Sequence, residues 1–369
     1  MSAPNDVGPL VRLWGIRTQD LPPQSATADE LAPFLASILK EAVPFIDSAA
    51  PKSTTAPAPA GPREQLWKPR GTKSHPDSAA RVEVSERVIP ARDLLEAAAA
   101  AAAAAAVVTG DDDDDKNEEE KKKKKEKKKM APETWACRRS VHEDAARRGT
   151  ASWAEFERCF RDDHAQSERR FTPNVVGARE ALRWGGCAGV TLPNPDSGGA
   201  RRWGRFGLAV VEMRHKVGRP VLKDRTFPVL QMTCSLVDDA EDGDGDGEER
   251  EREREKEKGE EKEFLVVSIP VPDFGAASEA STLAREKDAQ VAVYVSVERV
   301  RKLPAAGDSN GDIEWLMATA SDAAGVLPIW VQNMAMPGVI WKDVPLFLGW
   351  IAGERDKGKD RGPATGTGD

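Results

Sequence analysis

The chain has 369 residues, of which 31% are charged, and its formal net charge is −8. The segment Asp238–Glu263 holds 15 acidic and 6 basic residues, a local net of −9 that accounts for all of this negative charge. The remainder therefore offers no strongly basic face for nucleic acid. Cys137, Cys159, Cys187 and Cys234 match neither a zinc pattern nor a disulfide framework, and the first residues lack a secretory signal. We expect a cytoplasmic protein.

The N-terminal part contains one clear helix signal. Apolar residues recur at helical spacing over Thr27–Asp47, and Thr27 with Glu30 matches a capping box. A helix with such a stripe must bury it against protein. Residues 1–50 are therefore expected to form a helical segment that packs on the main domain.

The next stretch alternates between biased composition and a single strand signal. Residues 51–80 are rich in Pro, Ala, Ser and Thr and are typical of a linker. Arg81–Ile89 alternates polar and apolar residues, which predicts a strand. Residues 96–131 contain alanine, aspartate and lysine runs and are expected to form a low-complexity insertion in an expanded loop. The lysines of this insertion leave open a nuclear or peripheral membrane association.

Order returns after this insertion. Thr134–His142 can form a strand, and Ser152 can cap a short helix. No helical crossover long enough for a parallel connection separates most of the strand-like runs that follow, so an antiparallel sheet is predicted. Residues 237–263 then form an acidic, disordered hairpin insertion. The five strand-like runs are Arg201–Val217, Thr226–Leu236, Glu263–Val271, Gln290–Arg301 and Asp312–Ser321.

The acidic insertion also contains the spacing D-x-D-x-D-G-x5-E over Asp242–Glu253. A calcium-binding loop of that kind needs a helix on each side, and here a strand precedes the motif. We therefore expect weak cation association and no specific metal site.

The C-terminal stretch Gly325–Glu354 is apolar and amphipathic. Pro337 and Gly338 should divide it into two helical pieces, and Asp343 can cap the second. The second piece is too short to span a bilayer. It should instead pack in the hollow of the antiparallel sheet, an arrangement that often leaves a cavity. Residues 356–369 are expected to be a disordered tail.

Several motifs resemble the fungal START-like proteins grouped as domain of unknown function 3074. The resemblance implies an α+β helix-grip fold, in which a curved antiparallel sheet wraps around a long C-terminal helix and encloses an apolar tunnel. In better-understood START relatives this tunnel holds a lipid or sterol. An additional N-terminal helix is expected, and the long insertions at Ala97–Lys129 and Asp238–Glu263 depart from the family pattern. The motifs are LAPFLASILKEAVPFI (31–46), LKDRTFPVLQMTC (222–234), FLVVSIPV (264–271), VSVERVRKLP (295–304), EWLMATASDAAGVLP (314–328) and PGVIWKDVPLFLGWI (337–351).

Strand and helix periodicity suggests which side chains line such a cavity. Methionine and aromatic side chains suit an adaptable apolar pocket, although the same pattern fits a filled core. The predicted lining residues are Met213, His215, Leu230, Met232, Cys234, Trp315, Met317, Trp330 and Met334. Possible polar contacts to a ligand are Arg214, Arg225, Glu298 and Arg299.

No motif for a hydrolase nucleophile, a zinc protease or a phosphate loop is present, so no catalytic residue is assigned. His215 could orient a ligand hydroxyl, act in acid–base chemistry, or simply sit at the end of its strand. The leading hypothesis is a monomeric, non-catalytic module, without a cofactor, that binds or transfers a lipid or sterol and contacts membranes transiently. A cyclase- or aromatase-type enzyme and a filled interaction scaffold remain alternatives. The START-like domain is expected to comprise residues 81–95 and 132–355.

Overall fold

The computed structural model describes ten ranges of the chain. Their strands form a single 11-stranded sheet. The strand order is β1-β2-β3-β11-β10-β8-β7-β6-β4, with β5 paired to β6 and β9 paired to β7. The described residues are 7–49, 66–109, 131–186, 189–193, 200–216, 223–237, 262–287, 289–303, 311–322 and 338–360.

The sheet is antiparallel apart from the short parallel pairing of β9 with β7. All the runs predicted as strands form strands. Gln290–Arg301 divides into β9 and β10, and β1, β4 and β5 are additional. The strands are β1 (Lys68–His75), β2 (Ser78–Ile89), β3 (Glu133–Glu143), β4 (Val175–Trp184), β5 (Val190–Pro193), β6 (Ala200–His215), β7 (Asp224–Val237), β8 (Glu263–Pro270), β9 (Ala289–Val291), β10 (Val293–Lys302) and β11 (Asp312–Asp322).

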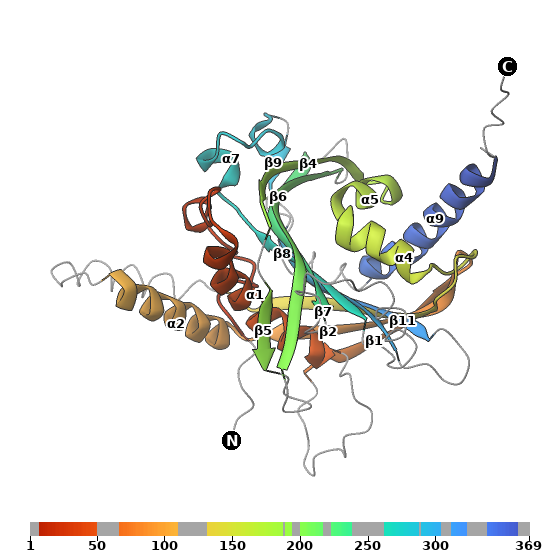
Figure 1. The fold of residues 1–369 in the computed structure, drawn as a ribbon, viewed down its shortest axis with the longest axis horizontal. Helices are drawn as coiled ribbons and strands as arrows, with labels where there is room; N and C mark the ends of the chain where they lie inside the picture. The colour runs from red at the N-terminus through yellow and green to blue at the C-terminus, as the bar shows by residue number, and fades with distance from the viewer. Residues whose placement is uncertain are drawn as a thin grey trace, which may run out of the picture.

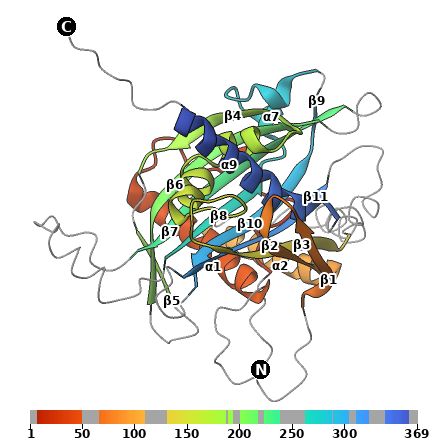
Figure 2. The same cartoon turned by 90° about the vertical axis from the view of Figure 1, so that its right-hand side faces the viewer.

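Helices cover both faces of this sheet (Figure 1). Figure 2 shows the C-terminal helix α9 running across the strands. The larger helices are α1 (Ala28–Ala49), α2 (Ala91–Thr109), α5 (His164–Phe171) and α9 (Asp343–Asp360). The short ones are η1 (Thr18–Asp20), α4 (Trp153–Phe156), the π-helix η2 (Glu157–Asp162), α7 (Phe274–Ala277), η3 (Leu283–Arg285) and η4 (Ile340–Lys342).

The two faces of the sheet bury separate apolar clusters. One face packs against α1, and its cluster includes Leu35 and Ile38 of α1 with Leu230 and Val297 of the sheet. The other face packs against α4, η2 and α9. The sheet curves around α4, α5 and α9 in Figure 1. This is the predicted α+β helix-grip arrangement, with the N-terminal helix added on the outer face.

Helix α1 begins as its sequence predicts. The backbone N–H of Thr27 donates to the Glu30 carboxylate at 2.8 Å, and the Thr27 hydroxyl accepts from the Glu30 N–H at 3.4 Å, which completes the capping box. Leu35 and Ile38 are fully buried. At its C-terminal end Asp47 forms an ion pair with Arg299 of β10. The helix is therefore fixed to the sheet by apolar burial and by charge.

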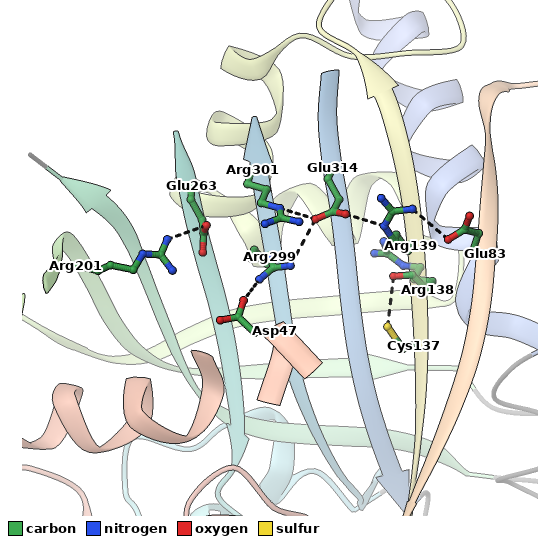
Figure 3. A network of polar contacts seen from close by, with 10 residues as sticks. All are labelled: Asp47, Glu83, Cys137, Arg138, Arg139, Arg201, Glu263, Arg299, Arg301 and Glu314. Carbon is green, nitrogen blue, oxygen red and sulfur yellow. Dashed lines mark hydrogen bonds and ion pairs between the residues drawn. The ribbon is translucent and has the colours of Figure 1, made fainter. Parts of the chain in front are cut away.

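A network of charged groups covers the sheet on the α1 side (Figure 3). Glu314 of β11 is buried and accepts from Arg139 Nε at 2.7 Å and from Arg301 Nε at 2.6 Å. Arg299 Nη2 lies 3.5 Å from the same carboxylate. These guanidinium groups hold the pKa of Glu314 below its ordinary value against the effect of burial. The network thus compensates buried charge on three adjacent strands.

Two segments expected to lack structure contain regular elements. The expected linker 51–80 includes the edge strand β1, whose residues are mostly exposed and therefore give no apolar alternation. The expected insertion 96–131 contains most of α2, which reaches Thr109 because alanine has the highest helix propensity. Leu94 and Ala97 are buried and anchor that helix.

The described C-terminal stretch consists of η4 followed by α9. Val344, Phe347, Leu348 and Ile351 form the predicted apolar face and are fully buried against the sheet side that also carries α4 and η2. The helix continues to Asp360, beyond the predicted start of a tail at residue 356. Residues 325–337, which hold the first predicted helical piece and Pro337 of the predicted break, lie outside the described residues. No described helix has the length and hydropathy needed to cross a membrane.

Candidate functional site

A cavity of about 250 Å³ lies on the sheet face that α5 and α9 cover. Its wall combines aromatic and thioether side chains with an unusual number of ionisable groups. The lining residues are Arg138, Phe160, His164, Glu168, Phe171, His215, Phe227, Tyr294, Ser296, Glu298, Met317, Thr319, Ser321 and Asp343.

Strand alternation builds the floor of the cavity. On β10 and β11, alternate residues face the cavity, and the register pairs three such residues of β10 with three of β11. Neighbouring strands β6 and β7 contribute His215 and Phe227, whose rings pack edge to face with centroids 5.1 Å apart. The three facing pairs are Tyr294 with Ser321, Ser296 with Thr319 and Glu298 with Met317.

Helical residues form the opposite wall. The π-helix η2 contributes Phe160, and α5 presents His164, Glu168 and Phe171 at helical spacing toward the sheet. π-Helical turns often mark functional sites because they redirect side chains within a helix. Asp343, the first residue of α9, closes one side. The cavity therefore depends on three separate helical elements and five strands.

The polar end of the cavity centres on Arg138 of β3. Its Nη2 donates to Glu298 Oε1 at 3.1 Å, and its Nε lies 3.7 Å from Asp343 Oδ2. Trp315 Nε1 donates to the same Glu298 oxygen at 2.6 Å. The guanidinium carbon stands 3.9 Å from the centroid of the Trp315 ring, a cation–π contact that fixes its plane. Arg138 Nη1 has no hydrogen-bond partner among the described residues.

Glu168 lies beside this group, and its carboxylate makes no side-chain hydrogen bond to the described residues. His164 Nε2 lies 3.7 Å from Glu168 Oε2. About a quarter (26%) of the Glu168 side-chain surface remains accessible, and the residue lines the cavity. Its carboxyl group is thus available to a molecule in the cavity.

Burial shifts the acid–base behaviour of these groups. Burial and the neighbouring Asp343 and Glu298 carboxylates raise the pKa of Glu168 to about 8. Burial also raises the pKa of Asp343 to about 6, although Arg138 opposes the change. Burial lowers the pKa of His215 to about 4, so this imidazole is neutral at physiological pH. The positive charge near the Glu168 and Asp343 carboxyl groups is therefore too small to hold their pKa values at the ordinary level.

Several predicted lining residues do meet at this cavity. His215, Met317 and Glu298 line it. Met213 shares the face of β6 with His215, as predicted, and is buried beside Phe227. Trp315 does not line the cavity itself; it belongs to the adjoining apolar cluster and contacts the Arg138 guanidinium with its ring.

The predicted lining residues on β7 need a correction. Leu230, Met232 and Cys234 do share one strand face, but they belong to the cluster beneath α1, on the other side of the sheet. Phe227 and Val229 are the β7 residues that face the cavity side. Both faces of β7 are buried, so alternation alone could not assign the correct one.

Three predicted polar contacts lie elsewhere. Arg214 pairs with Glu286 and donates to the Leu283 carbonyl at 2.8 Å. Arg225 is buried and donates to the Lys223 carbonyl at 2.5 Å. Arg299 belongs to the network on the α1 face. The two remaining predicted lining residues, Trp330 and Met334, fall outside the described residues.

Sequence reasoning missed the residues that make the cavity polar: Arg138, His164, Glu168 and Asp343. His164 and Glu168 stand four residues apart, a spacing that places them on one helix face. Asp343 was predicted only as a helix cap. Arg138 gave no signal, because its strand carries two consecutive arginines and either could face inward.

A second hollow of about 400 Å³ lies between η2, α5 and α9 and is bordered by charged side chains. Arg355 and Glu155 pair across it at 2.6 Å. No set of three or more His, Cys, Asp and Glu side chains in the described part of the chain is placed to hold a metal ion. The calcium-like motif lies outside the described residues.

Comparison with known proteins gives one family and several distant structural matches. No curated protein matches the chain. Human STARD10 aligns with a TM-score of 0.43 at 11% identity, covering 87% of this chain and 82% of that one. Human StAR-related lipid transfer protein 5 aligns with a TM-score of 0.41 at 11% identity, covering 88% and 99%.

A third solved structure, the human StarD13 (DLC2) lipid transfer and protein localization domain, aligns with a TM-score of 0.36 at 11% identity, covering 77% of this chain and 88% of that one. The model of the family described as "Protein of unknown function (DUF3074)" matches residues 135–351, which include the strands and helices around the cavity. The chain therefore belongs to the DUF3074 family.

Proposed function

We propose that the protein binds a hydrophobic small molecule of the lipid or sterol class in the cavity between the sheet and the helices η2, α5 and α9. The observation that carries the proposal is a lining that combines Phe160, Phe171, Phe227 and Met317 with the Nη1 of the buried Arg138, which has no hydrogen-bond partner among the described residues. Apolar walls with a few fixed polar groups are typical of ligand sites.

The volume of the cavity limits the size of the ligand that it can hold. Ligand pockets commonly measure about 300 to 1,000 Å³, and the cavity of about 250 Å³ lies just below that range. It therefore holds a small ligand or the polar end of a longer one. A bulky two-chain lipid would have to extend past the described lining.

The test combines recovery and uptake of ligand. Full-length protein purified without detergent is extracted and analysed by mass spectrometry, and uptake of a labelled single-chain lipid is measured in parallel. Ser296→Phe places a ring in the cavity floor and should abolish uptake, whereas Ser74→Phe on the exposed edge strand β1 should leave it intact. Absence of recovered lipid and of uptake would refute the proposal. Transfer between vesicles would then show whether membrane contact is part of the activity.

An enzyme of the cyclase or aromatase type is a second candidate, because His215, Arg138 and Glu168 converge on one cavity. Such convergence of acid and base groups is what proton-transfer catalysis requires. A linear poly-β-ketone incubated with the protein should then be recovered in a cyclised form. Recovery of the unchanged compound, despite binding, would remove this candidate.

A further inference from the structure

The charge balance at the polar end of the cavity points to a particular ligand chemistry. Glu168, Glu298 and Asp343 bring three carboxyl groups to the wall, and Arg138 is the one Lys or Arg side chain among the described lining residues. Arg138 already faces two of the carboxyl groups, since it bonds Glu298 at 3.1 Å and lies 3.7 Å from Asp343. Glu168 has no ion pair with a Lys or Arg side chain among the described residues, and its titratable neighbour is His164 at 3.7 Å.

The position of His164 increases this imbalance. Its Nδ1 lies 3.1 Å from the carbonyl oxygen of Phe160, and because a carbonyl can only accept, Nδ1 carries the proton. In the neutral imidazole, Nε2 is then an acceptor. It stands 3.7 Å from Glu168 Oε2, which is a second acceptor facing it across a gap once Glu168 is ionised. A hydrogen-bond donor brought by a ligand would satisfy both.

The surrounding rings favour a cation over other donors. Phe160 and Phe171 both line the cavity, with centroids 6.0 Å apart, and their π-electron faces attract positive charge. The unpartnered Arg138 Nη1 is an independent sign of a ligand, because the residue is 1% exposed and a buried donor needs an acceptor. A hydroxyl or ether oxygen next to the nitrogen of the ligand would supply that acceptor.

Resting on the proposed function, we infer that the cavity selects amphiphiles whose polar end is an ammonium group and excludes those that end in an anion. The nitrogen displaces the proton that Glu168 otherwise holds at neutral pH, donates to the resulting carboxylate and to His164 Nε2, and offsets the negative charge around it. An anionic head in the same place would keep Glu168 protonated and would face the carboxyl groups of Glu298 and Asp343, so its binding is disfavoured.

Three probes with the same tail test this selection on the full-length protein. Dodecylamine, dodecan-1-ol and sodium dodecanoate differ only in the head and are titrated below their micellar concentrations in competition with a fluorescent apolar probe. Dodecylamine should bind at least about tenfold more tightly than dodecan-1-ol, because a charge-assisted hydrogen bond replaces a neutral one. Dodecanoate should bind more weakly than dodecan-1-ol.

The variant Glu168→Gln separates the cavity from other acidic parts of the chain. The acidic segment Asp238–Glu263 could attract dodecylamine without any cavity, and this variant leaves that segment unchanged. Glu168→Gln should remove most of the tenfold preference for the amine and change dodecan-1-ol binding by less than about twofold. The matched control Glu180→Gln, which removes a carboxylate paired with Arg183 away from the cavity, should change neither.

The outcomes separate this inference from the proposed function. If the alcohol binds as tightly as the amine, or the carboxylate more tightly, the selection is refuted while binding in the cavity stands. A preference for the amine that survives Glu168→Gln also refutes it. If none of the three probes binds, the proposed function fails and this inference fails with it.

Discussion

The partly buried carboxyl group of Glu168 should make the protein less stable as pH rises. Its pKa is raised to about 8 in the folded state from an ordinary value of 4.5. Between these two values the folded protein binds more protons than the unfolded chain, so the free energy of unfolding falls with increasing pH. Glu168→Gln removes this titration and should therefore stabilise the protein at pH 8 but not at pH 5.

The size of the effect follows from the two pKa values. One pKa unit corresponds to about 1.4 kcal/mol, which sets a ceiling of about 5 kcal/mol for the change. The 26% of the side-chain surface that stays accessible allows water to solvate the charge. We therefore expect about 2 kcal/mol at pH 8, or about 4 to 8 °C in the melting temperature.

The assay compares the melting temperatures of wild-type protein and Glu168→Gln from pH 5 to pH 8. The control Glu180→Gln should follow the wild type throughout, because that carboxylate is on the surface and paired with Arg183. A constant difference between wild type and Glu168→Gln across the pH range would refute the reasoning, since a pH-independent effect cannot arise from titration of the group.

Three further predictions concern stability. Glu212 is buried and accepts from the backbone N–H groups of Thr282–Ala284; burial raises its pKa, but these bonds and the one from Ser281 outweigh burial and lower it. Glu212→Gln should therefore cost about 2 kcal/mol of unfolding free energy at pH 7 and speed hydrogen exchange at those amides. The variant should also lose less stability than the wild type when the pH falls. Glu314→Gln should lower the free energy of unfolding in urea by about 3 kcal/mol, because it leaves buried arginines without their anion. No loss would show that the network does not contribute to stability. Ile38→Ala should cost about 2 to 5 kcal/mol by the same assay, and a loss below 1 kcal/mol would mean that α1 is not part of the core.

The strands were the most predictable part of the fold, because most have one buried and one polar face or a continuous apolar run. β1 and β4 escaped prediction for the opposite reason. β1 is exposed along nearly its whole length, and β4 is only partly buried, so neither carries an apolar pattern. Their place is fixed by hydrogen bonding to β2 and β6, which a single strand's sequence does not reveal.

The cavity was predictable only in part. The alternation of β6 correctly placed Met213 and His215 on one face. The same reasoning selected the wrong face of β7, because Met232 and its neighbours are buried on the α1 side, where the additional N-terminal helix creates a second apolar surface. Which arginine of β3 faces inward depends on its register with β11, and that register is a property of the whole sheet.

The charges at the polar end were not visible in the sequence for a related reason. Glu168 and Asp343 come from different helices, and Arg138 comes from a strand, so their proximity exists only in the folded chain. A charged residue on a short helix normally indicates a solvated surface. In the folded chain these residues instead line the cavity, where they can bind a polar group of a ligand.

Photo-crosslinking tests the central claim most directly. A dodecan-1-ol analogue with a diazirine in its tail is irradiated with full-length protein, and the modified peptides are identified by mass spectrometry. Binding in the cavity predicts labels on the peptides that contain Phe227 and Met317, and loss of these labels in Ser296→Phe. Labels confined to the hollow around Trp350, or to the α1 face of the sheet, would contradict the account.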